Sequence, residues 1–395
     1  MRLLLTNVFR EFYESGKLSG IILIFCTILT LVMVNSGFGE QYAHFLHNHS
    51  DLSFGPVALN LSNEHWINDG LMTIFFLLVG LEIERELYKG ELSSFSNALL
   101  PIAAAIGGML IPAGIHFALN AGTETQSGFG IPMATDIAFS LGVLSLLGNR
   151  VPASIKIFLT ALAIIDDLGA VAVIAVFYTA DFSFLYFGIA MGIFATLYML
   201  GRYGVNSLWV YLPAGVIMWY FMLQSGVHAT ITGVLLAFAI PSHPDDKKNV
   251  SYHLQHWLHK PVNFIILPVF AIANTGITLS AETFRTLGEK NSLGISLGLV
   301  FGKPVGIMLA CYLLVKAKIS SLPDDINFKT ILGAGLLAGI GFTMSVFISN
   351  LAFTEAHYIT ESKMAILVAS LISGLAGFIF LKNILSEEPI PTNRS

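Results

Sequence analysis

Long apolar runs, separated by short polar stretches, dominate the chain from residue 18 to residue 382. None of the runs shows the strict apolar–polar alternation of a β-barrel strand. Because backbone groups in lipid must be hydrogen-bonded within their own segment, we expect these runs to be helices. The twelve expected segments are 18–36, 64–82, 97–118, 131–148, 153–178, 184–200, 206–223, 226–240, 261–280, 292–316, 330–352 and 362–382. The pattern therefore predicts an all-α polytopic membrane protein with about twelve transmembrane helices.

The composition supports this fold class. Charged residues make up 11% of the chain, which is less than half of the usual share in soluble domains. A net charge of −5 gives no reason to expect a nucleic-acid partner. The two cysteines, Cys26 and Cys311, both lie in apolar runs, so the sequence offers neither a disulfide framework nor a zinc-binding spacing.

The basic residues indicate how the chain is oriented in the membrane. In the twelve-segment assignment, Lys and Arg gather on one side, apart from Arg285, Lys290, Lys303 and Lys363. Cytoplasmic loops carry this excess, so we expect both termini in the cytoplasm and an even number of spans. The expected arrangement is multi-pass.

We expect a single transmembrane domain over residues 1–395 with three polar regions. The segment 36–63 carries no Lys or Arg and is predicted to be periplasmic; "LSFGPVALNLS" within it reads partly as strand, so it could form a β-hairpin or a plain linker. Residues 241–260 are predicted to be a His-rich cytoplasmic loop, and 383–395 a cytoplasmic tail. We interpret the histidines of this loop as solvated side chains and not as a metal site. Histidines spaced by three residues would point in steadily changing directions around a helix.

Four charged residues fall inside the expected spans: Asp136, Asp166, Asp167 and Lys303. Each costs about 2.5–3.5 kcal/mol at the centre of a membrane helix, so such residues are usually functional. Asp166 and Asp167 differ by about 100° around a helix but can line one cavity. A purely structural ion pair with Lys303 would leave one aspartate uncompensated, which favours a functional pair.

Two of the expected spans are interrupted by helix-breaking residues. "GIPMATDIAFSLG" contains Pro132 and the polar pair Thr135 and Asp136, and "LLAGIGFTMSVFIS" has a similar break at Gly339, Gly341 and Thr343. Paired interrupted segments in two halves of a chain indicate a transporter built from inverted repeats, with its site at the midplane. "GKP" at 302–304 lacks the Ser or Thr of a phosphate loop, so no nucleotide and no cofactor are expected.

The chain resembles the NhaA-type sodium/proton antiporters of bacterial inner membranes over nearly its whole length. The similarity rests on "WINDGLMTIFFLLVGLEIERE" (66–86), "IPMATDIAFSLGVLSLLG" (131–148), "KIFLTALAIIDDLGAV" (156–171), "SGVHATITGVLLAF" (225–238), "GKPVGI" (302–307) and "GIGFTMSVFI" (339–348). This resemblance implies twelve helices, with two interrupted helices crossing at the midplane. It also implies a homodimer that exchanges Na⁺ or Li⁺ for H⁺ electrogenically and is active at alkaline pH.

The resemblance assigns roles to residues as well. It places the cation and proton site, including bound Na⁺, at Asp166 and Asp167, with Asp167 as the principal group. Thr135 and Asp136 match the helix crossing, and Lys303 matches a membrane lysine that can pair with Asp166. The pH response is assigned to Glu82, Arg85, Glu86, His228, His256 and His259.

The chemistry of these residues agrees with antiport. Na⁺ is a hard cation that prefers oxygen ligands, and a carboxylate shielded from water holds a proton more tightly. Two other classes stay open at this point. An intramembrane aspartyl protease also uses two membrane carboxylates, and a cation channel would need a continuous pore.

The chain departs from the family pattern before the ninth segment. The family has a sequence similar to L-E-H-x-L-H-P there, with a lysine three residues before the glutamate, whereas this chain reads "YHLQHWLHK". Gln255 replaces the carboxylate and Tyr252 the lysine, and Glu84 adds an acid elsewhere. We therefore expect a pH profile that is shallower or shifted relative to the family.

Overall fold

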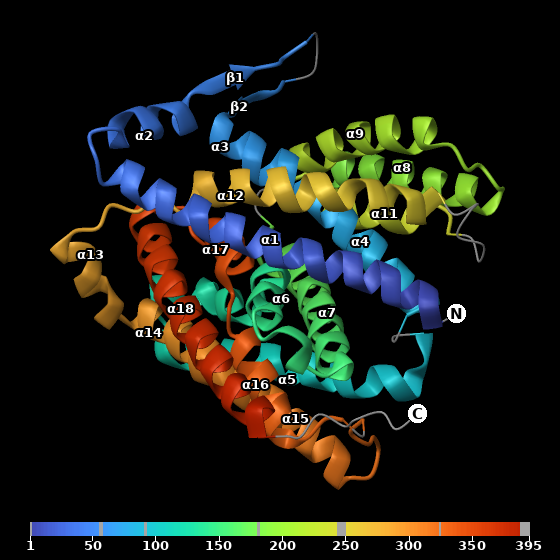
Figure 1. Ribbon diagram of the computed structural model, residues 1–395. Coiled ribbons are helices and arrows are strands. Elements are labelled where there is room, and N and C mark those ends of the chain that lie inside the picture. Colours follow the sequence, from blue (N-terminus) through green and yellow to red (C-terminus); the bar gives the residue numbers. More distant parts are fainter. Residues whose placement is uncertain are drawn as a thin grey trace. The chain divides into compact units, whose positions relative to one another are not determined.

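The computed structural model describes residues 2–54, 58–90, 93–179, 182–242, 250–323 and 325–387 (Figure 1). The chain packs as two compact units that each combine distant parts of the sequence. The first unit consists of Met1–Ile22, Glu91–Ala170 and Leu279–Ser395, and the second of Leu23–Gly90 and Val171–Thr278.

The first unit contains the interrupted segments. Its elements are the first part of α1 (Arg2–Val34), α5 (Phe95–Asn120), η3 (Glu124–Met133), α6 (Ile137–Ser145), η4 (Gly148–Arg150), α7 (Ala153–Phe177) as far as Ala170, α13 (Ala281–Arg285), η7 (Thr286–Gly288), α14 (Lys290–Leu297), η8 (Gly298–Gly302), α15 (Lys303–Lys316), α16 (Phe328–Ala338), α17 (Phe342–Ala352) and α18 (Ala356–Glu387).

The second unit is also mainly helical. Its elements are the remainder of α1 and α7, α2 (Gly39–His47), β1 (His49–Asp51), β2 (Asn60–Ser62), α3 (Asn63–His65), η1 (Trp66–Leu71), α4 (Met72–Tyr88), α8 (Phe184–Arg202), α9 (Leu208–Gln224), α10 (Ile231–Ala239), α11 (Val250–Pro261), η6 (Val262–Ile266) and α12 (Leu267–Asn274).

The predicted all-α polytopic membrane fold is confirmed. Among the described residues, six helices are long and apolar enough to cross a membrane, and up to nine spans result if each of three bent helix pairs is one span. Two of the bent pairs are η3 with α6 and α16 with α17, which are the two segments expected to be interrupted. The total of twelve spans stays a prediction.

The polar regions differ in detail from the expected loops. Between residues 36 and 63, α2 precedes two short antiparallel strands, in which His49 pairs with Ser62 and Asp51 with Asn60. Residues 250–260, expected in a loop, are instead helical in α11, while 243–249 lie outside the described residues. The segment is helical because its buried residues lie on one face of a helix that packs on α4. These residues are Ser251, Leu254, Gln255 and Leu258. In the expected tail, α18 continues to Glu387, and 388–395 lie outside the description.

Glycines allow the helices of the first unit to approach closely. A Cβ atom on Gly306 of α15 would lie 2.1 Å from the carbonyl oxygen of Gly107 on α5, and one on Gly107 would lie 2.3 Å from the carbonyl oxygen of Gly306. Small residues at such crossings let helix backbones pack against each other in membranes. The close contact positions α15, which begins at Lys303, against α5.

Candidate functional site

Two interrupted helices of the first unit meet at their breaks. The axes of η3 and α6 differ by 42°, and those of α16 and α17 by 49°. Ala134 is extended where η3 ends, and the N–H of Asp136 donates to the carbonyl oxygen of Ile340 at 2.7 Å. The hydroxyl of Thr135 donates to the carbonyl oxygen of Ala338 at 3.0 Å. Each break thus supplies hydrogen-bond partners for the other, which satisfies backbone groups that an uninterrupted helix would satisfy itself.

Asp136 caps two helices at once. It is the N-cap of α6, where its Oδ1 accepts from the N–H of Phe139 at 2.9 Å. Its Oδ2 accepts from the N–H of Thr343, in the first turn of α17, at 3.0 Å, and also from the Thr343 hydroxyl. The N-terminal ends of helices carry partial positive charge, so one buried carboxylate stabilises both ends.

Asp166 and Lys303 form an ion pair beside these breaks. The two side chains are completely buried, and Lys303 Nζ lies 2.8 Å from Asp166 Oδ2. The hydroxyl of Thr135 lies 2.7 Å from the same oxygen, so its single proton is shared between Asp166 and the Ala338 carbonyl. Lys303 also donates to the carbonyl oxygen of Met133, the last residue of η3. The lysine therefore bridges a carboxylate on α7 and the carbonyl end of an interrupted helix.

Asp167 follows Asp166 on α7 and is also completely buried. Successive residues of a helix point about 100° apart, so the two carboxylates cannot face Lys303 identically. Lys303 nevertheless interacts electrostatically with both aspartates. Two buried acids next to a single buried base form a site that is rich in oxygen ligands.

The sequence around Lys303 explains its unusual place. The π-helical turn η8 ends at Gly302, and Pro304 lies in the first turn of α15. Proline has no N–H to continue the hydrogen-bond ladder, and π-turns are frequent at functional sites. A Cβ on Gly298 would lie 2.7 Å from Pro132, and one on Gly335 would lie 3.0 Å from Pro304, so both glycines allow a helix to pack closely against a proline.

The arrangement suits exchange of a small cation for a proton. Carboxylate and carbonyl oxygens are the ligands that hard cations prefer. The Oδ1 atom of Asp166 is buried and accepts no hydrogen bond from the residues that the structure describes. Protons and cations can therefore compete for oxygen atoms in this part of the first unit.

The comparisons with known proteins agree with one another. The model of the family described as "Na+/H+ antiporter 1" matches residues 10–381. This chain belongs to the Na⁺/H⁺ antiporter 1 family. It is 57% identical to the Na⁺/H⁺ antiporter NhaA of Flavobacterium psychrophilum over 97% of this chain and 98% of that protein. It is also 58% identical to the NhaA of Dechloromonas aromatica over 95% and 96% of the two chains.

The fold has a counterpart among solved structures. The sodium/proton antiporter MjNhaP1 from Methanocaldococcus jannaschii, solved at pH 8, matches 98% of this chain and 99% of its own with a TM-score of 0.51. The sequence identity is 14%, so this likeness concerns the fold alone. It agrees with the helical architecture.

The residues predicted for the pH response lie in the second unit of this antiporter-family chain. Glu82 and the adjacent acid Glu84 are buried on α4, and both are hydrogen-bonded from α11. Gln255 is bonded to Glu82, and the Ser251 hydroxyl donates to Glu84 at 2.7 Å. Arg85 donates to its neighbour Glu86 at 3.1 Å.

The three histidines in this prediction are not gathered at one point. His256 is exposed on α11, while His259 is half-buried and lies 3.3 Å from the Asn263 amide. His228 bonds to the carbonyl oxygen of Tyr178 at 2.8 Å, not to a residue of α4 or α11.

Some residues of the two sites were not identified from the sequence. Ser251 and the Met133 carbonyl both contact the charged groups described above, yet neither is unusual in its local sequence. The only available signal was the helical spacing of Ser251 and Gln255, which places both on one face of α11.

Proposed function

We propose that this protein exchanges Na⁺ for H⁺ across the membrane, with Asp166 and Asp167 as the shared binding site. The observation that carries the proposal is the burial of two adjacent carboxylates beside Lys303 at the meeting point of two interrupted helices. Membership of an antiporter family supports it.

Coupling follows from competition at one site. A deprotonated aspartate binds Na⁺, and a protonated one releases it, because the proton neutralises the ligand charge. Asp167 is the principal group in this proposal, since Asp166 Oδ2 is already engaged by Lys303 and Thr135. Exchange occurs if the site opens to one side of the membrane at a time.

The finer features of the proposal follow the family. Transport is electrogenic, accepts Li⁺ as well as Na⁺, and increases at alkaline pH because the aspartates must lose protons before they bind the cation. The protein is a homodimer in the bacterial inner membrane, with both termini in the cytoplasm, and serves sodium and pH homeostasis. It is a secondary transporter, without a nucleotide or another cofactor.

Reconstitution into liposomes that contain a pH-sensitive dye tests the activity. The vesicles are prepared with an acidic or an alkaline interior. When Na⁺ is then added outside, its entry should move protons out of the vesicles, and a membrane potential should change the rate. A Na⁺ flux that does not respond to an opposing proton gradient would indicate a channel. Cleavage of a membrane-segment peptide would indicate an aspartyl protease.

The shared site is tested by Asp167→Asn, which keeps the shape of the side chain but not its charge. We expect this variant to reach the membrane in normal amounts and to lose Na⁺-dependent proton movement in everted vesicles. Asp51→Asn, at an exposed strand position, is the matched control and should retain exchange. Near-normal exchange by Asp167→Asn would refute the assignment.

A further inference from the structure

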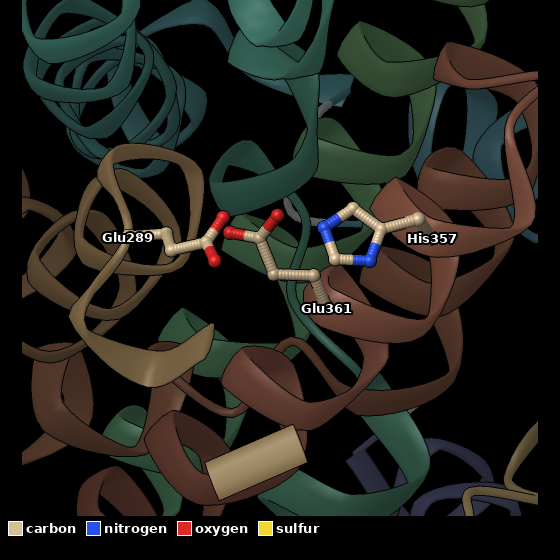
Figure 2. A group of neighbouring side chains, drawn as sticks. All are labelled: Glu289, His357 and Glu361. Atoms are coloured by element: carbon tan, nitrogen blue, oxygen red, sulfur yellow. The ribbon is translucent and has the colours of Figure 1, made fainter. Parts of the chain in front are cut away.

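A second group of ligand-type side chains lies in the first unit, on other elements than the aspartates. Glu289 is the N-cap of α14, and His357 and Glu361 lie on α18. One ligand atom from each of the three residues lies within 4.8 Å of those from the other two. His357 and Glu361 are four residues apart, so they lie on the same face of α18. Figure 2 shows the Glu361 carboxylate between the Glu289 carboxylate and the imidazole of His357.

Glu361 is fixed in position, whereas the other two side chains can move. Its side chain is 1% exposed. The Oε1 atom accepts from the N–H of Ser292 at 2.9 Å and from the Ser292 hydroxyl at 3.0 Å, both in the first turn of α14. Glu289 and His357 are exposed. The group thus combines one anchored ligand with two adjustable ones.

The other oxygen of Glu361 points to a missing ligand. Oε2 is buried and has no hydrogen-bond partner among the described residues. An unsatisfied buried carboxylate oxygen costs free energy, so such atoms usually coordinate an ion, accept from water or carry a proton. Because this carboxylate faces Glu289 and His357, a cation bound among the three residues would satisfy it (Figure 2).

The surrounding charge also favours a cation. Tyr358, the neighbour of His357, donates a hydrogen bond to Glu124 at 2.6 Å. Glu124, Glu355 and Glu361 all interact electrostatically with this tyrosine. The N-terminal end of α18 therefore carries several acidic groups, which attract positive ions.

We propose that Glu289, His357 and Glu361 bind a divalent transition-metal ion, with Zn²⁺ as the best match. Two carboxylates alone would suit Ca²⁺ or Mg²⁺, whereas an imidazole in the set favours a metal such as Zn²⁺. In tetrahedral Zn²⁺ coordination the ligand atoms are separated by about 3.4 Å, and water completes the shell. Small rotations of the two exposed side chains would close the present spacing.

The position of the site suggests its role. The expected spans of α14 and α18 start beside it, and the predicted orientation puts these ends outside the cytoplasm. A metal that joins Glu289 to α18 would tie the beginnings of two packed helices together. The inference is independent of the proposed antiport, because it involves none of the residues assigned to transport.

The test is Zn²⁺ binding to the purified full-length protein. The protein carries no histidine tag, because a tag would add Zn²⁺ ligands to the eleven histidines of the chain. Isothermal titration should show one saturable Zn²⁺ site per chain, and the apparent unfolding temperature should rise with Zn²⁺ concentration. Glu361→Gln and His357→Ala should each raise the Kd for Zn²⁺ by about tenfold or more. His357 is exposed, so its replacement leaves the fold intact.

Glu355→Gln is the matched control. It removes a nearby negative charge from an exposed position that supplies no ligand, so its Kd should change by less than about threefold. Absence of Zn²⁺ binding, or binding that survives both Glu361→Gln and His357→Ala, would overturn the proposal. Ca²⁺ binding as tight as that of Zn²⁺ would overturn the assignment of the metal class.

Discussion

Replacement of Lys303 by alanine should destabilise the protein by leaving Asp166 buried without its cation. Both side chains are fully buried and 2.8 Å apart, and Lys303 also donates to the Met133 carbonyl. Breaking a buried ion pair by removing one partner costs about 3–5 kcal/mol, because an uncompensated charge remains. The Thr135 hydrogen bond to Asp166 stays in place and offsets only a small part of this loss. We expect Lys303→Ala to lose transport and stability together.

The loss should depend on pH in a defined direction. In Lys303→Ala the charged form of Asp166 is the costly one, so taking up a proton relieves the penalty. The variant should therefore approach wild-type stability in acid and become less stable as the pH rises. The measurement is the apparent unfolding temperature in detergent, recorded by tryptophan fluorescence at about pH 6 and about pH 8.5. Because unfolding in detergent can be irreversible, both proteins need the same scan rate.

Three further variants separate charge from packing. Lys303→Arg keeps the positive charge and should retain part of the stability and exchange. Lys303→Ala with Asp166→Asn removes both charges and should recover most of the lost stability, since an unpaired charge no longer remains. Lys316→Ala, at the exposed end of the same helix, is the control and should behave as wild type. A Lys303→Ala protein as stable as wild type at both pH values would refute the reasoning.

Three other predictions follow from the structure. Asp136→Ala removes the caps of α6 and α17 and should lower the free energy of unfolding by about 1 kcal/mol for each helix. Thr343→Val should lower it by about half of that total, and equal apparent unfolding temperatures for the two variants would contradict this. Gly306→Ala should cost about 1–3 kcal/mol through its clash with Gly107, while Gly188→Ala, which meets nothing within 4 Å, should be neutral or slightly stabilising in the same thermal assay. Gln255→Glu with Tyr252→Lys places a carboxylate against Glu82, so the two acids must share a proton. Transport recorded against pH should then become steeper, and a profile that overlaps the wild type would show that this contact does not set the pH response.

The fold was largely predictable because its signals are local. Apolar runs of span length and the helix-breaking residues Pro132, Gly339 and Gly341 are visible in short windows of sequence. They predict membrane helices and two interruptions, and the structure has both. The helix α11 was missed because its polar and histidine-rich composition resembles a loop. Its four buried residues form a helical pattern that makes sense only once α4 provides the surface that covers them.

The charged residues of the site could be identified from the sequence, but their contacts could not. A carboxylate or lysine within an apolar run is conspicuous, so Asp136, Asp166, Asp167 and Lys303 were apparent at once. Their partners are backbone carbonyls, hydroxyls and N–H groups, which every segment has. Glu289 and Glu361 show the same difficulty, because nothing in either local sequence indicates that the two carboxylates meet.

In the proposed exchange, the contacts around the two breaks bear on which aspartate binds the transported ions. Asp136 is balanced by the N-terminal ends of α6 and α17, whose partial positive charges together approach one unit. Lys303 is engaged by Asp166 and by the carbonyl end of η3, so that pair is neutral as long as both groups are charged. If the cation site used the Asp166 carboxylate alone, Na⁺ would have to compete with an ammonium 2.8 Å away. Asp167 is a second buried carboxylate with which Lys303 also interacts electrostatically. In the proposed exchange it binds the Na⁺ or the proton, so that the Asp166–Lys303 ion pair stays in place. The contact between Asp166 and Lys303 is therefore our reason for proposing Asp167, and not Asp166, as the group whose charge changes in each transport cycle.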